Sequence, residues 1–171
     1  SEDECDQEFT SQFLSNFTPL KILGHGGFGC VFEAERHLEN VVKWKCAVKR
    51  IPIRGRGKEL TDALREVEAL IDFDHRRIVK FHDAWKEEPP RGWQSKADED
   101  LLKKLKSNEQ FSYAPDCAFL YIQMELCQST LAEWLSVNTS RPKAKMLMWF
   151  SQIVDAVAYI HDRGKIHRDL K

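Results

Sequence analysis

The sequence predicts an α+β fold, in which a five-stranded antiparallel sheet with one packed helix comes first and a helical region follows. Between residues 17 and 127, short apolar runs typical of strands alternate with turn-length polar segments. One stretch in that region has apolar residues at helical spacing instead. From residue 128 onward the apolar pattern is helical. Residues 1–16 begin with an acidic, polar stretch and are expected to form a flexible lead-in.

The predicted strands fall into two groups. The runs PLKIL, CVFEAE and KWKCAVKRI follow one another with short polar segments between them, which predicts an antiparallel meander. IVKFHDAW and CAFLYIQMEL are the two further strands. Residues 86–116 between them are rich in charged residues, serine and proline, so we interpret them as a charged insertion. Its LLKKLK stretch is expected to be a solvated helix or disordered, and an amphipathic helix for a partner is the alternative.

Helical periodicity predicts one helix on the sheet and two helices after it. In LTDALREVEALIDF, one face that should pack on the sheet carries Leu60, Leu64, Val67 and Ile71. Thr130 and Glu133 have capping-box spacing, which predicts a short helix with Leu131, Trp134 and Leu135. A longer helix is expected from about residue 143 to 163, with Gly164 at its C-terminal cap. Its apolar stripe is expected to be core and consists of Met146, Phe150, Ile153, Val154, Val157 and Ile160.

Composition and cysteine usage narrow the function classes. The formal net charge is -1, so the charge balance indicates neither a nucleic acid nor an anionic membrane as a partner of this segment. The 5 cysteines form no C-x-x-C pair, which disfavours a disulfide framework and a zinc site and favours a reducing, cytoplasmic compartment. For the same reason we interpret the glycosylation triplets at Asn16 and Asn138 as chance. No apolar run is long enough to span a membrane, so any anchor of a parent protein would lie outside this segment.

A glycine cluster carries the first chemical signal. Gly24-His25-Gly26-Gly27-Phe28-Gly29 matches G-x-G-x-x-G, a pattern found in more than one phosphate-binding fold. In a dinucleotide-binding unit the glycines open a helix, whereas here Cys30-Val31-Phe32 continues as a strand, so a hairpin is expected. Glycines let the backbone approach phosphate oxygens closely, and Phe28 could cover them from solvent. An ordinary glycine-rich hairpin is the alternative.

Two charged residues differ from the solvated charges around them. Lys49 lies in the apolar run Ala47-Val48-Lys49, and a lysine that points inward from a strand needs a counter-charge or an anionic ligand such as phosphate. Glu66 lies near the middle of the helix that should cover this sheet. An ion pair between Lys49 and Glu66 is expected to direct the ammonium group at nucleotide phosphates. Helical acids are usually solvated, and we interpret Glu59, Asp62 and Glu68 that way.

The chain ends in KIHRDLK, which on its own could be a surface turn. Glycine loop, strand lysine, helix glutamate and His167-Arg168-Asp169 form an ordered set, and with this set residues 17–171 resemble the eukaryotic protein kinases. The resemblance implies a kinase fold, with the small lobe and hinge over residues 17–127. Residues 128–171 would begin the helical large lobe and end inside its catalytic loop.

The resemblance also implies a role for each matching residue. Asp169 would accept the proton of the substrate hydroxyl, while Lys49 would hold the ATP phosphates and Glu66 would orient Lys49. Lys171 resembles the serine/threonine branch, where this lysine steadies the γ-phosphate. The glycine loop would cover ATP, and backbone groups of Glu125 and Cys127, on either side of Leu126, would bond the adenine edge. The implied nucleotide contacts are Leu23, Gly24, Gly26, Gly27, Phe28, Gly29, Val31, Ala47, Lys49, Met124, Glu125 and Cys127.

Two features that kinases need for phosphoryl transfer are expected after Lys171. They are an asparagine and an Asp-Phe-Gly segment, which in the family hold Mg²⁺, so no metal ligand is assigned within residues 1–171. We therefore expect residues 1–171 alone to transfer no phosphate. An active parent serine/threonine kinase is the leading hypothesis, and a catalytically silent kinase-like interaction module is the alternative.

A narrower resemblance rests on LGHGGFGCVFEA, on His75-x-x-Ile78-Val79 up to Ala84-Trp85, and on LYIQMELC. These segments resemble the stress kinases that phosphorylate the α subunit of translation initiation factor 2, which also carry a charged insertion. Within that group the resemblance is strongest to the PKR-like endoplasmic-reticulum kinases of the unfolded-protein response, whose kinase domains face the cytosol. The resemblance implies pairing of two copies through their small lobes. A serine/threonine kinase with another substrate is the alternative.

Overall fold

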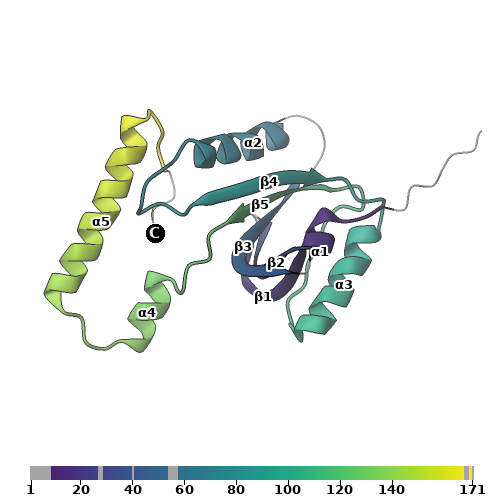
Figure 1. Cartoon of the computed structure of the whole chain (residues 1–171), viewed down its shortest axis with the longest axis horizontal. Coiled ribbons are helices and arrows are strands. Elements are labelled where there is room, and N and C mark those ends of the chain that lie inside the picture. The colour runs from purple at the N-terminus through teal and green to yellow at the C-terminus, as the bar shows by residue number, and fades with distance from the viewer. Residues whose placement is uncertain (1–8, 27–28, 40, 54–57, 168–169, 171) are drawn as a thin grey trace, which may run out of the picture.

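Five strands form one antiparallel sheet, as the sequence predicts, and their order in the sheet is β1-β2-β3-β5-β4. Helices lie on both sides of the sheet (Figure 1). The computed structural model describes residues 9–26, 29–39, 41–53, 58–167 and 170. In chain order the elements are α1 (Gln12–Asn16), β1 (Phe17–Gly26), β2 (Gly29–Leu38), β3 (Val42–Ile53), α2 (Lys58–Ile71), β4 (Phe81–Glu87), α3 (Trp93–Leu105), β5 (Ala118–Met124), α4 (Leu131–Val137) and α5 (Lys143–Asp162).

The sheet has two faces with different partners, because successive side chains of a strand point to opposite sides. We call one side the outer face, where Phe32 of β2 packs with Phe13 of α1 and Leu101 of α3. On the other side, the inner face, Ile122 of β5 packs with Val67 of α2. The central strands β3 and β5 therefore contribute side chains to both cores.

Helix α2 packs on the inner face, but by a stripe that differs from the predicted one. Leu64 and Ile71 were expected to be buried and are exposed, so the prediction is wrong for these two residues. The residues that pack are Leu60, Ala63, Val67 and Leu70. Both stripes have helical spacing and both are apolar, so periodicity cannot distinguish them. The small side chain of Ala63 lets the helix approach the sheet closely.

Helix α1 corrects part of the expected flexible lead-in, because residues 12–16 are helical. The Ser11 side chain caps the helix by accepting a hydrogen bond from the Leu14 N–H. Phe13 is 1% exposed, and its backbone N–H donates to the buried Glu87 carboxylate at 2.8 Å. Residues 9–16 are thus part of the outer-face core and its edge, while residues 1–8 lie outside the described residues.

The LLKKLK stretch of the charged insertion belongs to α3, which packs on the sheet by one side, so the expectation of a freely solvated helix or disorder is wrong. The helix lies against the outer face (Figure 1), where Gln94, Asp98 and Leu101 are buried. Arg50 of β3 donates two hydrogen bonds to the Asp98 carboxylate, at 2.7 and 2.9 Å. A bidentate pair of this kind fixes orientation as well as distance. The pair fastens the helix to the strand.

The Arg50 guanidinium is enclosed by aromatic rings. Its Cζ atom lies 5.1 to 5.3 Å from four ring centroids, those of Phe32, Phe111, Tyr113 and Phe119. Burial by itself would lower the pKa of Arg50, but the Asp98 carboxylate and the tyrosine hydroxyls raise it above its ordinary value. The group therefore stays charged inside the core.

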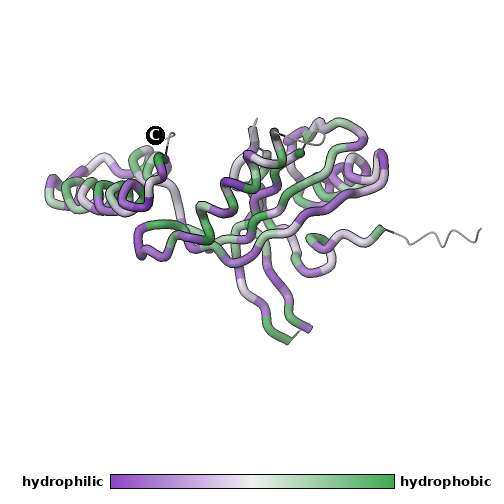
Figure 2. Tube along the Cα trace, turned by 90° about the horizontal axis from the view of Figure 1, so that it is seen from above, coloured by the Kyte–Doolittle hydropathy of each residue, from purple (hydrophilic) through white to green (hydrophobic). Residues whose placement is uncertain are grey.

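Helices α4 and α5 follow the hinge and lie apart from the sheet (Figures 1 and 2). The predicted capping box of α4 is confirmed, with Thr130 and Glu133 each accepting a hydrogen bond from the other's backbone N–H. The predicted end of α5 is confirmed as well. Gly164 has φ +69°, and the hydrogen bonds from Gly164 to His161 and from Lys165 to Ile160 form a Schellman motif.

The apolar stripe of α5 is only partly core. Ile160 is buried, but Phe150, Ile153 and Val154 are exposed, so their assignment to the core is wrong. Within the described residues, α5 is held on one side by the segment after α2, where the Tyr159 hydroxyl accepts from the Asp74 N–H at 2.9 Å. Contact on one side leaves the other side of the stripe open to solvent. None of the described helices combines the length and the apolar character that a membrane crossing needs.

Candidate active site

The register of the sheet brings four predicted nucleotide contacts onto one face. Val31 of β2 pairs with Lys49 of β3, and Ala47 of β3 pairs with Met124 of β5. Cross-strand partners share a face, and so do residues two apart on one strand. Val31, Ala47, Lys49 and Met124 therefore all belong to the inner face. Ala47 is buried, and Val31, Lys49 and Met124 are half-buried.

The stem of the glycine-rich loop stands at the end of this face. Gly24 pairs with Val31 and Gly26 with Gly29, so β1 and β2 form the predicted hairpin. Around Gly24 and Gly26, no atom of the described residues lies within 4 Å of the place where a side chain would begin. Leu23 is exposed beside the register shift in β1. Gly27 and Phe28 lie outside the described residues.

Gly29 packs tightly against the neighbouring strand. Its φ is +111°, and a Cβ atom there would lie 2.0 Å from the Arg50 carbonyl oxygen. Only glycine permits such an approach at such an angle. The contact fixes the start of β2 on β3, one residue away from Lys49.

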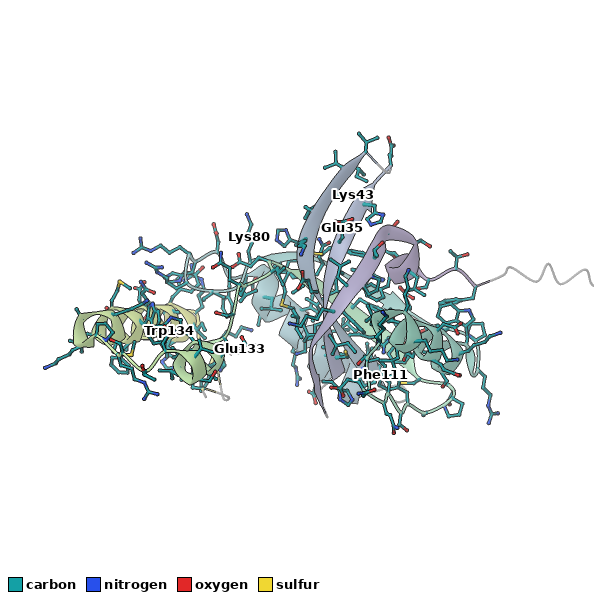
Figure 3. The ribbon with its side chains drawn as sticks, turned by 90° about the horizontal axis from the view of Figure 1, so that it is seen from below. Glu35, Lys43, Lys80, Phe111, Glu133 and Trp134 are labelled. Atoms are coloured by element: carbon teal, nitrogen blue, oxygen red, sulfur yellow. The ribbon has the colours of Figure 1, made fainter. Side chains whose placement is uncertain are left out.

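The hinge leaves the sheet after Met124. The Glu125 N–H donates to the carbonyl of Lys80, which precedes β4, at 2.9 Å (Figure 3 labels Lys80). Because that N–H is engaged, the carbonyl oxygen is the backbone group of Glu125 left for the predicted hydrogen bond to the adenine edge. Cys127 is exposed two residues later.

The remaining predicted catalytic residues lie outside what the structure describes. Glu66 belongs to α2, one residue before the buried Val67, but its side chain is not among those described. Asp169 and Lys171 also lie outside the described residues. The ion pair between Lys49 and Glu66 and the roles of Asp169 and Lys171 therefore stay predictions.

A groove of about 660 Å³ lies elsewhere, between the end of α2 and helices α4 and α5. Its described lining includes Leu70, Trp134, Ile153 and Leu170, and none of the predicted nucleotide contacts. The inner face of the sheet supplies one wall of the predicted nucleotide site, and the groove belongs to the helical part of the chain.

Sequence reasoning missed the residues on the opposite side of the site. Arg50 follows Lys49 and therefore points to the outer face, where it meets Asp98. The strand alternation was a signal that could have placed Arg50 there. No signal in the sequence pairs it with Asp98, which lies 48 residues further along the chain.

With the inner-face cluster and the glycine hairpin described, the family can be stated. The protein kinase domain family matches residues 17–171. The chain belongs to this family. Protein kinases in general use ATP and Mg²⁺, and the space that the described residues leave open around Gly24 and Gly26 fits the close approach of phosphate oxygens.

The kinase chain is related to eIF2-alpha kinases. It is 44% identical over 101 residues to "Eukaryotic translation initiation factor 2-alpha kinase pek-1" of Caenorhabditis elegans, which covers 59% of this chain and 9% of the relative. It is 35% identical over 177 residues to "Interferon-induced, double-stranded RNA-activated protein kinase" of Rattus norvegicus, 100% of this chain and 31% of the relative. It is 31% identical over 193 residues to "eIF-2-alpha kinase GCN2" of Arabidopsis thaliana, 98% of this chain and 14% of the relative. The chain spans less than a third of each of these relatives.

Proposed function

We propose that the chain is the nucleotide-binding part of a serine/threonine protein kinase that phosphorylates the α subunit of translation initiation factor 2. The observation that carries the proposal is the inner-face cluster of Val31, Ala47, Lys49 and Met124 beside the glycine hairpin. Phosphorylation of this subunit would inhibit translation under stress. The relatives named for the same substrate support the choice.

Each residue of the cluster would contact a different part of the nucleotide. Val31 and Ala47 would pack on the adenine ring, with Met124 behind it as gatekeeper. The Glu125 carbonyl would accept a hydrogen bond from the base, and the Cys127 N–H would donate one. The Lys49 ammonium would neutralise phosphate charge, and the backbone of the glycine hairpin would cover the phosphates.

Transfer of the phosphoryl group is assigned to two residues near the end of the chain and to Glu66 of α2. Asp169 would accept the substrate hydroxyl proton, Lys171 would steady the γ-phosphate, and Glu66 would hold Lys49 in place. Mg²⁺ would neutralise charge on the phosphates when bound. These roles follow from the match to the kinase pattern at those positions.

The branch within the group is a finer proposal. Identity is higher to pek-1, 44% over 59% of this chain, and to "Eukaryotic translation initiation factor 2-alpha kinase 3" of Bos taurus, 40% over 56%. The double-stranded RNA-activated kinase of Rattus norvegicus is aligned over the whole chain at 35%. We favour the PKR-like endoplasmic-reticulum branch on identity, which would place the parent protein at the cytosolic face of that membrane, with paired small lobes.

Nucleotide binding tests the carrying observation directly. We expect the 171-residue chain to bind a fluorescent ATP analogue with Mg²⁺, and Lys49→Ala to weaken binding at least about tenfold. Lys45→Ala is the matched control, since Lys45 is on the same strand and face but pairs with Glu33 at 2.7 Å. Equal loss in both variants would contradict a specific role for Lys49.

Substrate choice is tested with the kinase domain of the parent protein and purified initiation factor 2. We expect phosphate on a serine of the α subunit, detected by mass spectrometry, and none after Asp169→Asn. Phosphorylation of a generic protein but not of this subunit would favour a kinase with another substrate. Nucleotide binding without any transfer would favour the silent interaction module.

A further inference from the structure

The chain segment that returns from α3 to β5 touches the glycine-rich loop. We call residues 107–113 the return segment. Glu109 Oε2 lies 3.3 Å from His25 Nδ1, and the Phe111 ring packs edge-on against the His25 imidazole with centroids 5.3 Å apart. His25 is the middle residue of Gly24-His25-Gly26. It is therefore the one side chain within residues 24–26 that can hold the stem of the loop.

The return segment is itself fastened to the sheet. Phe111, labelled in Figure 3, lies beside the sheet on the side that carries α3. Its ring packs against Phe32 of β2 at 6.2 Å and against the Arg50 guanidinium at 5.1 Å. Arg50 is in turn held by Asp98 of α3 and lies 3.4 Å from the Tyr113 hydroxyl. The return segment is therefore packed on the outer face, and the buried pair of Arg50 and Asp98 holds it and α3 to the sheet.

His25 lies on the side of the hairpin away from the inner face. It pairs with Cys30, which is buried on the outer face, whereas the adjacent Gly24 pairs with the inner-face Val31. A nucleotide on the inner face would not meet the His25 ring. Any influence of His25 on nucleotide binding must pass through the backbone of the loop.

We propose that Glu109 and Phe111 of the insertion are positioning residues that hold His25 from the outer face, fix the described stem of the glycine-rich loop and so strengthen nucleotide binding. The proposal rests on the proposed nucleotide site. Glycines give the backbone of the stem many accessible conformations, and restricting them when a ligand binds costs entropy. A loop held at His25 has less freedom to lose, so it binds nucleotide more tightly.

Two measurements on the 171-residue chain test whether Glu109 and Phe111 hold His25. Amide hydrogen exchange without nucleotide reports the motion of residues 22–32, and titration with a fluorescent ATP analogue and Mg²⁺ reports affinity. For Phe111→Ala, Glu109→Ala and His25→Ala we expect faster exchange in this stretch and an affinity lower by about three- to tenfold. The conservative change Phe111→Tyr keeps the ring and should restore both values.

The matched control is Glu99→Ala, which removes an acid from the same insertion. Glu99 pairs with Lys103 on the exposed side of α3, at 2.7 Å. This variant should leave exchange in residues 22–32 and nucleotide affinity unchanged. The double variant of His25 and Phe111 should be no worse than the single variants, because both residues act through one contact.

Each outcome bears on one idea. Unchanged exchange in residues 22–32 for Phe111→Ala would overturn the hold on His25, whatever the nucleotide does. Faster exchange with unchanged affinity would overturn the positioning role, and so would faster exchange spread equally over β4 and β5, which indicates general loosening. Failure of the unaltered chain to bind ATP would contradict the proposed function instead, and the exchange comparison would still decide whether His25 is held.

Discussion

At Gly29 a single backbone position links the glycine hairpin to the strand of the candidate phosphate-binding lysine. The carbonyl of Arg50 occupies the place of a Cβ atom, so the two strands touch where other residues would keep them apart. Two residues along β3, Val48 is buried on the outer face and Lys49 beside it belongs to the inner face. The contact between the Gly29 backbone and the Arg50 carbonyl oxygen therefore fixes how far the start of β2 lies from the strand that carries Lys49.

We predict that Gly29→Ala lowers the free energy of unfolding by about 1–3 kcal/mol or more. The alanine would be strained at positive φ, and its Cβ atom would also clash with the Arg50 backbone. Gly24→Ala is the control, since no atom of the described residues lies within 4 Å of its Cβ position. Urea unfolding followed by circular dichroism compares the two. Equal stability of the two variants would contradict the close packing of Gly29 on Arg50.

The cysteines give a second prediction at this scale. Burial raises the pKa of the Cys30 thiol to about 12, so it stays a thiol at pH 8, where an exposed cysteine is partly thiolate. In a Cys5→Ser variant at pH 8, iodoacetamide should modify the exposed Cys127 and spare the buried Cys30, Cys46 and Cys117, as peptide mass mapping would reveal. ATP should slow the reaction, and rapid loss of Cys30 would contradict its burial.

At the scale of the element, the sequence predicted the strands well and the packing of the helices less well. The kinase resemblance grouped Val31, Ala47 and Lys49 as nucleotide contacts, and the register of β2 and β3 puts all three on the inner face. In α2 two apolar stripes competed, and only the tertiary contact selected Ala63 over Leu64. The docking of α3 depends on pairing over long separations, for which one sequence has no periodic signal.

The stripe of α2 can be tested by substitution. Ala63→Leu should destabilise the chain by about 1–3 kcal/mol because it overpacks the contact with the sheet, whereas Leu64→Ala should change stability by no more than about 0.5 kcal/mol. Thermal and urea unfolding measure both. The reverse order of effects would restore the stripe predicted from the sequence.

The docking of α3 rests on a buried ion pair, which makes a sharp prediction. Asp98→Ala leaves the Arg50 guanidinium buried without its carboxylate and should cost about 3–5 kcal/mol in urea unfolding. Asp100→Ala, an exposed acid on the same helix, should cost little. Replacing the pair together, Arg50→Met with Asp98→Leu, should recover much of the loss, and failure to do so would point to contacts of Asp98 besides Arg50.

For the whole molecule, helices pack on both faces of the sheet, while α4 and α5 leave apolar surface open. Phe150 is 65% exposed and Leu147 is 57% exposed on α5. Exposed apolar side chains on one helix favour contact with other protein. The structure does not describe the positions of Asp169 and Lys171. Their roles therefore stay predictions from the kinase resemblance.

Exposed apolar surface predicts self-association of the isolated chain. Phe150→Glu should reduce it at micromolar concentration, because a charge in that surface must be desolvated when two copies meet. Ser151→Glu adds the same charge to the exposed neighbouring position and should have little effect. Sedimentation velocity distinguishes the two, and equal association of both variants would place the contact elsewhere.

The ion pair between Arg50 and Asp98 also constrains how this sequence can change over generations. Either substitution alone strands a buried charge or an acid without its partner, so an intermediate with one change would be purged before the second arose. Homologues should therefore keep both residues or lack both. A lineage that deletes the insertion should also have replaced Arg50 with an apolar residue. The residue at position 50 in each homologue would therefore record whether the ancestral kinase carried a docked helix.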